Sequence, residues 1–189
     1  MTELNIKNAR NILLKNIKSK RMLRHSLAVS EGMKAIARHF GEDEELWGAV
    51  GLIHDVDYEF NPKEHCSHVH EILLCEGITE DIAHSISTHG YFKYPNTPMP
   101  ATLMERCLYA VDRISWIGVA AAYRSADKGA SLTADEILTL LESDELGDRF
   151  SCEYIMAACK RANISHELAA ECIALGIRQN HEKISRADI

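Results

Sequence analysis

The pair His54-Asp55 places two residue types suited to metal chemistry side by side in this sequence. The pair follows residues 46–53, a stretch that is almost entirely apolar and is therefore expected to be buried. Imidazole nitrogen and carboxylate oxygen are both good ligands for divalent metal ions. Because adjacent side chains of these types can bind one ion, the pair predicts the centre of a metal site.

Helical spacing indicates that other potential ligands face the same interior. In residues 21–40, steps of three or four connect Met22, His25, Val29, Met33, Ile36 and Phe40, which is the pattern of one helix face. The same spacing turns His54, His89 and Asp112 inward in three further segments. A lone inward histidine is most often a hydrogen-bonded core residue, but a buried carboxylate such as Asp112 is costly unless it is paired, protonated or metal-bound. The combination of His25, His54-Asp55 and Asp112 predicts a metal site.

The elements that position these residues all have a helical period, and no alternating strand pattern occurs. Thr79 is expected to cap the helix that reaches His89, and Thr133 and Glu136 form a capping-box pattern at the start of another. Three prolines mark residues 91–100 as a loop. The predicted helices span residues 6–17, 21–40, 44–54, 61–77, 79–89, 102–125, 133 onward, 144–162 and 166–178, with a break at 127–131. The sequence predicts one all-α domain spanning 1–189, with a metal-binding core at about 20–125 and a helical extension at about 130–189.

Composition and charge exclude several classes of protein. The 189 residues are 46% hydrophobic and 26% charged, which is typical of a globular chain. A net charge of -7 argues against a nucleic-acid polymer as the main partner. No apolar run approaches the ~18 residues of a membrane span, and the first residues lack the apolar core of a signal peptide, so we expect a cytoplasmic protein. Six cysteines without a C-x-x-C pair favour reduced buried thiols.

The order His25, His54-Asp55, Asp112 resembles the HD superfamily of metal-dependent phosphohydrolases. The resemblance covers roughly residues 20–125, and the whole chain is similar to a subgroup of stand-alone predicted HD hydrolases. The segments that carry it are Met22 to Ser30, the run 42–48 and His54-Asp55-Val56-Asp57-Tyr58-Glu59. The resemblance implies an all-α HD-domain helical bundle.

Family members with more histidines hold two metal ions, and the resemblance implies His65 and His89 as the two further ligands here. His68 remains an alternative to His65, because it lies three residues on and shares its helical face. His70 and His84 are expected to be solvated or outside the ligand set. The implied cofactor is one or two divalent transition-metal ions, with Fe or Mn favoured and Zn, Co, Ni or Mg as alternatives.

The implied activity is hydrolysis of a small phosphorylated metabolite or nucleotide, since such metal ions bind phosphate and activate water. Asp55 and Asp57 are the catalytic candidates, although Asp57 and Glu59 could equally make loop hydrogen bonds. Cationic side chains near the ligands could bind substrate: Arg24, Lys63 and Arg113, with Arg21 and Lys93 as further candidates. Tyr91, Phe92 and Tyr94 could wall the pocket. The alternatives are a di-iron oxygenase-type enzyme and a non-catalytic ligand-binding module, and the carboxy-terminal helices either cover the core or form a homodimer face.

Overall fold

Helices make up most of the described chain, which is residues 4–128, 132–142 and 152–181 of this computed structural model. No strand occurs within those ranges, so the all-α fold expected from the sequence is confirmed. The helices are α1 (Ile6–Asn16), α2 (Lys20–Phe40), α3 (Glu44–Ile53), α4 (Val69–Cys75), α5 (Glu80–Ser87), the 3-10 turn η1 (Thr88–Gly90), α6 (Leu103–Lys128), α7 (Ala134–Glu142), α8 (Cys152–Arg161) and α9 (His166–His181).

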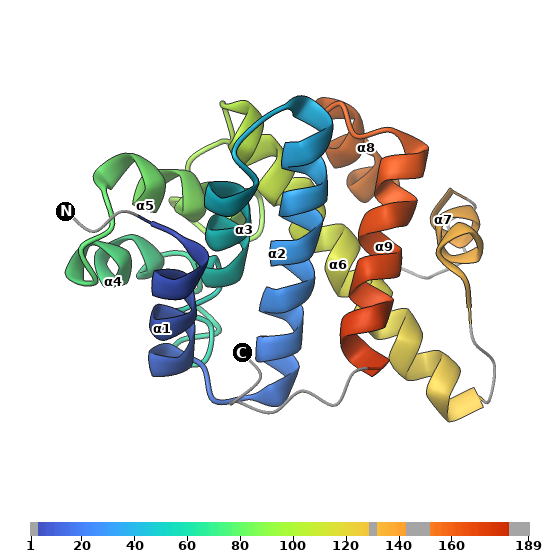
Figure 1. Cartoon of the computed structure of the whole chain (residues 1–189), viewed down its shortest axis with the longest axis horizontal. Coiled ribbons are helices and arrows are strands. Elements are labelled where there is room, and N and C mark those ends of the chain that lie inside the picture. The colour runs from blue at the N-terminus through green and yellow to red at the C-terminus, as the bar shows by residue number, and fades with distance from the viewer. Residues whose placement is uncertain (1–3, 129–131, 143–151, 182–189) are drawn as a thin grey trace.

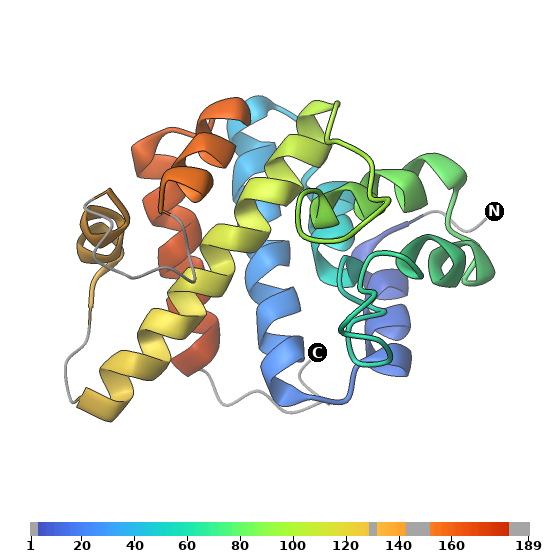
Figure 2. The same ribbon diagram turned by 180° about the vertical axis from the view of Figure 1, so that it is seen from behind.

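The arrangement is centred on α2, which packs against α3 on one side and α9 on the other (Figure 1). Seen from behind, α6 runs diagonally across α2 and α9 and contacts both (Figure 2). On the amino-terminal side α1 packs on α3, and α4 packs on α5. The metal-capable residues of the sequence therefore come from elements that meet beside α2.

The limits of α2 follow from its terminal residues. The Ser19 hydroxyl accepts a hydrogen bond from the Met22 amide at its start, and Gly41 ends it with a left-handed φ of 72°, where glycine carries no steric cost. Met22, Met33 and the rest of the predicted apolar face are buried, apart from the half-buried Phe40. His25 is only 1% exposed, so its predicted inward orientation is confirmed.

A close crossing brings the end of α3 against α2. A Cβ atom on Gly51 would lie 3.0 Å from the backbone of Ser30, so only glycine allows the two helices to approach this far. The Ser30 hydroxyl also donates a 2.8 Å hydrogen bond to the Gly48 carbonyl. This crossing places His54, directly after α3, beside His25 in α2.

The prediction of a helix over residues 61–77 is wrong in its first half. Turns occupy residues 54–68 apart from one unassigned position at 61, and the helix is only α4, from Val69. Asp57 explains the difference, because its two carboxylate oxygens accept hydrogen bonds from His65 Nδ1 and from the Cys66 amide. Cys66 has a left-handed φ of 69°, which is incompatible with a continuous helix.

The predicted helix over residues 79–89 forms as α5 and η1, and the expected loop over 91–100 follows. The buried Glu105 anchors the next element, α6. Its carboxylate accepts hydrogen bonds from the Ala101 and Thr102 amides and from the Ser85 hydroxyl. α6 extends to Lys128, three residues beyond its predicted end and into the predicted break at 127–131, of which residues 129–131 lie outside the described residues.

The carboxy-terminal helices pack onto the rest of the bundle. The capping box forms at α7, where the Thr133 amide donates to Glu136 Oε2 and the Glu136 amide donates to the Thr133 hydroxyl. The helix predicted over 144–162 is α8, and residues 143–151 lie outside the described residues. α9 contacts α2, α6 and α7. None of the described helices is long and apolar enough to cross a bilayer.

Candidate metal centre

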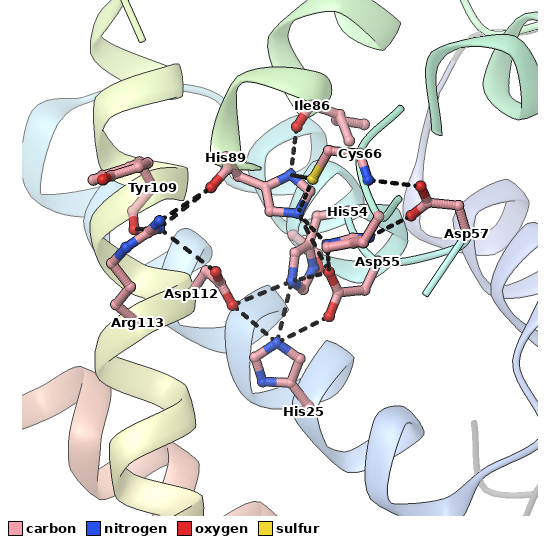
Figure 3. Close-up of polar contacts among 12 residues, drawn as sticks. His25, His54, Asp55, Asp57, Cys66, Ile86, His89, Tyr109, Asp112 and Arg113 are labelled. Atoms are coloured by element: carbon pink, nitrogen blue, oxygen red, sulfur yellow. Dashed lines mark hydrogen bonds and ion pairs between the residues drawn. The ribbon is translucent and has the colours of Figure 1, made fainter. Parts of the chain in front are cut away.

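Four side chains from three parts of the fold converge at the meeting point of α2, α3 and α6 (Figure 3). His25 Nε2 lies 3.2 Å from His54 Nε2, 3.3 Å from Asp55 Oδ2 and 3.0 Å from Asp112 Oδ1. His54 Nε2 is 3.5 Å from the same Asp112 oxygen. Two imidazole nitrogens and two carboxylates thus surround one point.

A second group shares Asp55 with the first. His65 Nε2 and His89 Nε2 are 3.0 Å apart, and Asp55 Oδ1 lies 2.9 Å from the former and 3.3 Å from the latter. Asp55 Oδ2 faces His25, whereas Oδ1 faces His65 and His89 and also lies 3.4 Å from His54 Nε2. This is the arrangement of a carboxylate that can bridge two metal positions.

The Nδ1 atoms of three of these histidines are already occupied. His54 Nδ1 donates to the Gly51 carbonyl at 2.8 Å, and His89 Nδ1 donates to the Ile86 carbonyl at 2.5 Å. His65 Nδ1 donates to Asp57 Oδ1 at 2.6 Å. Because each partner is an acceptor, each Nδ1 carries a proton, and each Nε2 faces the cluster, where it can present its lone pair to a metal ion. Hydrogen bonds of this kind orient histidine ligands in metal proteins.

The spacing of the donor atoms fits coordinated metal ions. With metal–ligand bonds of about 2.1 Å, neighbouring ligand atoms are about 3.0 Å apart in an octahedron and about 3.4 Å apart in a tetrahedron. The distances between the donor atoms that face the cluster lie between 2.9 and 3.5 Å. His25, His54 and Asp55 form one potential metal-binding group, and His65 and His89 belong to another. The residues present therefore fit one or two ions.

The electrostatics of the cluster favour bound positive charge. Burial opposes ionisation of Asp55 and Asp112, but the surrounding histidines outweigh it and hold both pKa values well below their usual range. Burial likewise opposes the charge on His25, yet its bonds to the two carboxylates raise its pKa to about 9. Asp55 raises the pKa of His65 in the same way. Without a metal ion, protons on the histidines therefore balance the carboxylates.

The structure separates His65 from the other histidines of its segment. His65 is 4% exposed and points into the cluster, whereas His68 lies on the surface beside Glu64 and Glu71. His70 pairs with Glu80 at 2.9 Å, and His84 is exposed. Of the alternatives left open by the sequence, the geometry brings His65 and not His68 to the site.

Asp57 lies where it positions other residues of the site. It is 1% exposed, bonds His65 and the Cys66 amide, and does not line the cavity beside the cluster. These contacts favour a positioning role, and a catalytic role for Asp57 stays a prediction. Glu59 makes the loop hydrogen bonds considered for it, accepting from the amides of Lys18 and Ser19.

A cavity of about 470 Å³ opens onto the cluster. Asp55 and Asp112 reach it, and Lys93 and Arg113 supply its cationic side chains. Its wall is completed by His25, His65, His89, Met22, Tyr58, Gly90, Phe92, Tyr94, Trp116, Tyr154 and Ile155. The expected role of Tyr94 and Phe92 as pocket walls agrees with this lining.

The predicted cationic residues differ in their access to this cavity. Arg113 lines it and also donates to the Tyr109 carbonyl at 2.7 Å and the His89 carbonyl at 3.3 Å, so part of its guanidinium braces the wall. Arg24 and Lys63 are outside the lining, so their predicted role in substrate binding gains no support from this cavity and stays a prediction. Lys63 is exposed in the turn that replaces the predicted start of a helix. Lys93, only a secondary candidate from the sequence, lies in the lining instead.

Cys66 is the residue that the sequence reasoning missed. Its Sγ lies 3.3 Å from His89 Nε2, and it forms a potential metal-binding group with His65 and His89. Burial opposes ionisation of this thiol, but His89 and His65 outweigh it and lower its pKa. No C-x-x-C or other cysteine spacing could have indicated it, although its position directly after His65 was a usable signal.

The described helices form an all-α bundle, and its donors follow one another along the chain as His25, His54, Asp55, His65, His89 and Asp112. This arrangement defines a class of metal-binding helical domains. A family profile described as HD domain matches residues 22–117, a range that holds all six donors named from the sequence. The chain belongs to the HD domain family. No curated protein and no solved structure matches the chain.

Proposed function

We propose that this protein is a metal-dependent phosphohydrolase acting on a small phosphorylated metabolite or nucleotide. The observation that carries the proposal is the position of Asp55, whose carboxylate lies between the pair His25 and His54 and the pair His65 and His89, beside a cavity. Membership of the HD domain family supports the same reaction class. Divalent ions held by such donors polarise a phosphoryl group and activate water for attack on phosphorus.

The residues of the chain supply the rest of the site. His25, His54, Asp55 and Asp112 hold one metal position, and His65, His89 and Asp55 hold the other. Nitrogen and carboxylate donors suit Fe, Mn, Co, Ni or Zn, and we favour Fe or Mn.

Substrate binding falls to the side chains that line the cavity above the metal positions. Lys93 and Arg113 neutralise the negative charge of the phosphate. Partial burial opposes the charge on Lys93, but the hydroxyl of Tyr94 and the carboxylate of Asp112 outweigh it and raise its pKa. The ammonium is therefore charged at neutral pH and available to an anion.

The size and wall of the cavity favour a small substrate. A volume of about 470 Å³ is in the range of small-molecule sites and holds no polymer. Tyr58, Tyr94 and Trp116 offer aromatic faces for the organic part of the substrate. The net charge of -7 also disfavours a nucleic-acid polymer.

The test combines metal content with hydrolysis. Protein purified without oxygen is analysed for metals and assayed against a panel of phosphate esters, beside the His54→Ala and Asp55→Ala variants. We expect one or two transition-metal ions per chain and hydrolysis of at least one ester. Both variants should lose hydrolysis, Asp55→Ala should lose all bound metal, and His54→Ala should lose the ion of the His25 position. His68→Ala is the matched control, because His68 is an exposed histidine of the same region and its removal leaves metal and activity intact.

Two outcomes would overturn the proposal. A wild-type protein that folds normally without metal contradicts the metal site itself. Metal without hydrolysis of any ester contradicts the phosphohydrolase, and it points to the oxygenase-type enzyme or to the ligand-binding module.

A further inference from the structure

Cys66 lies against the second metal position in the buried wall of the site. Its side chain is buried, with 3% exposure, and it is absent from the cavity lining that includes His65 and His89. Its Sγ is 3.3 Å from His89 Nε2, the same nitrogen that is 3.0 Å from His65 Nε2 and 3.3 Å from Asp55 Oδ1. Sulfur, two nitrogens and a carboxylate oxygen therefore gather around one point.

The backbone is shaped to aim two consecutive side chains at that point. Asp57 Oδ1 accepts from His65 Nδ1 and Asp57 Oδ2 accepts from the Cys66 amide at 2.8 Å, so one carboxylate fixes both residues. Cys66 adopts φ 69°, a left-handed conformation that costs a non-glycine residue about 1 kcal/mol or more. In a regular helix or strand, neighbouring side chains diverge, and this turn lets them converge.

Gly90 allows the sulfur to come this close to His89. A Cβ atom on Gly90 would lie 2.6 Å from Cys66 Sγ and 2.8 Å from Cys66 Cβ, so any other residue would push Cys66 away. The approach is thus built into two segments, the turn at 65–66 and the end of η1. A cysteine needed only to fill core volume requires neither the left-handed turn nor the glycine opposite it.

We propose that Cys66 Sγ is a ligand of the metal position formed by His65, His89 and Asp55. The inference rests on the proposed metal-dependent function and adds a thiolate to its donor set. A metal–sulfur bond of about 2.3 Å and a metal–nitrogen bond of about 2.1 Å place the two atoms about 3.1–3.6 Å apart, and the Sγ–Nε2 distance is 3.3 Å. Sγ also lies 3.9 Å from His89 Nδ1, so it lies beside the imidazole ring, and a rotation of the Cys66 side chain brings it in front of Nε2. Cys66 binds from the wall, which leaves the cavity side open.

The two metal positions are then chemically unequal. His25, His54, Asp55 and Asp112 offer only nitrogen and oxygen, whereas the position beside Cys66 adds a soft sulfur donor. Thiolate donors favour Zn and Fe over Mn or Mg. When zinc and manganese are offered together, we expect zinc to bind at the Cys66 position and manganese at the other position.

Zinc K-edge X-ray absorption of protein loaded with two zinc ions per chain tests the assignment directly. We expect a sulfur scatterer at about 2.3 Å in wild-type protein. The scatterer disappears in Cys66→Ser. The affinity for one of the two zinc ions also falls at least about tenfold, because removal of a residue that only hydrogen-bonds a metal ligand already lowers metal affinity by that factor. Cys75→Ser is the matched control, because Cys75 is an exposed free cysteine and its removal leaves the sulfur signal unchanged.

His25→Ala separates the two positions, since it damages the other group of donors and leaves the sulfur scatterer in place. Wild-type protein with two zinc ions and no sulfur scatterer overturns the assignment, whatever the variants do. A scatterer that persists in Cys66→Ser overturns it equally. If sulfur ligation is found without phosphoester hydrolysis, Cys66 is a ligand and the phosphohydrolase proposal fails. If hydrolysis is found without sulfur ligation, the phosphohydrolase proposal stands and the assignment of Cys66 fails.

Discussion

Asp57 Oδ1 accepts a 2.6 Å hydrogen bond from His65 Nδ1, and this contact sets the direction in which His65 presents its other nitrogen. The same carboxylate binds the Cys66 amide through Oδ2. Asp57 is thus a positioning residue for a turn that lacks regular secondary structure. Its influence on the site is exerted through His65 and Cys66.

The Asp57→Asn variant tests this role. An asparagine keeps one acceptor oxygen, so it satisfies either His65 Nδ1 or the Cys66 amide but not both. We expect the affinity of one of the two metal ions to fall about 10–100-fold, while the other ion is retained. Metal titration followed by calorimetry measures both affinities. Equal weakening of both ions, or no weakening, would contradict a role confined to the His65 position.

Asp55 and the flanking histidines predict a pattern of metal stoichiometry. Because Asp55 faces both groups of donors, Asp55→Ala should lose both ions, whereas His25→Ala and His89→Ala should each lose one. Elemental analysis of the dialysed variants gives the count per chain. If Asp55→Ala keeps one ion bound as tightly as wild type, the carboxylate does not bridge.

Helical periodicity was sufficient to predict the inward direction of His25, His54 and Asp112. Each lies within or directly after a regular helix, where the position of one residue fixes the direction of the others. The burial of their neighbours follows from the same periodicity, which is why the all-α fold could also be predicted.

The residues of the turn at 57–66 could not be predicted in the same way. Their directions depend on hydrogen bonds from one carboxylate and on a left-handed residue, and neither leaves a periodic pattern in the sequence. The Asn61-Pro62 pair looked like a helix start because Asn and Pro favour that position locally, but the bonds made by Asp57 override it. Cys66 was missed for this reason.

The stability of the metal-free protein should depend on pH above neutrality. Hydrogen bonds to Asp112 and Asp55 raise the pKa of His25 from 6.5 to about 9, and the pKa of His89 is raised to about 10. A raised folded-state pKa means that the proton stabilises the fold fully below pH 6.5 and that this stabilisation is lost as pH rises through about 9 to 10. The depressed pKa values of Asp55 and Asp112 act at low pH, outside this window. The lowered pKa of the Cys66 thiol acts inside it, because it adds stability as pH rises toward 9.0 and offsets part of the loss.

We therefore expect the Tm of metal-free protein to fall by at least about 10 °C between pH 6.5 and pH 10, as measured by differential scanning calorimetry. The metal-loaded protein serves as the control. Its Tm should hold or rise over the same range, because metal binding strengthens when the histidines are free of protons. A metal-free protein whose Tm is constant over this range would contradict the protonated cluster.

Lys93 and Lys63 provide a matched pair for the role of the cavity in substrate binding. Both are exposed lysines near the site, but only Lys93 lines the cavity. An ammonium that bonds a phosphate oxygen contributes about 1.5–3 kcal/mol, so Lys93→Ala should lower kcat/KM about 10–100-fold on the ester that wild-type enzyme hydrolyses best. Lys63→Ala should leave kcat/KM within about twofold of wild type, since the solvated charge makes no contact with the bound phosphate. Metal content measured in parallel should be unchanged in both variants. Equal losses of kcat/KM in the two variants would show that general surface charge, not a contact in the cavity, attracts the substrate.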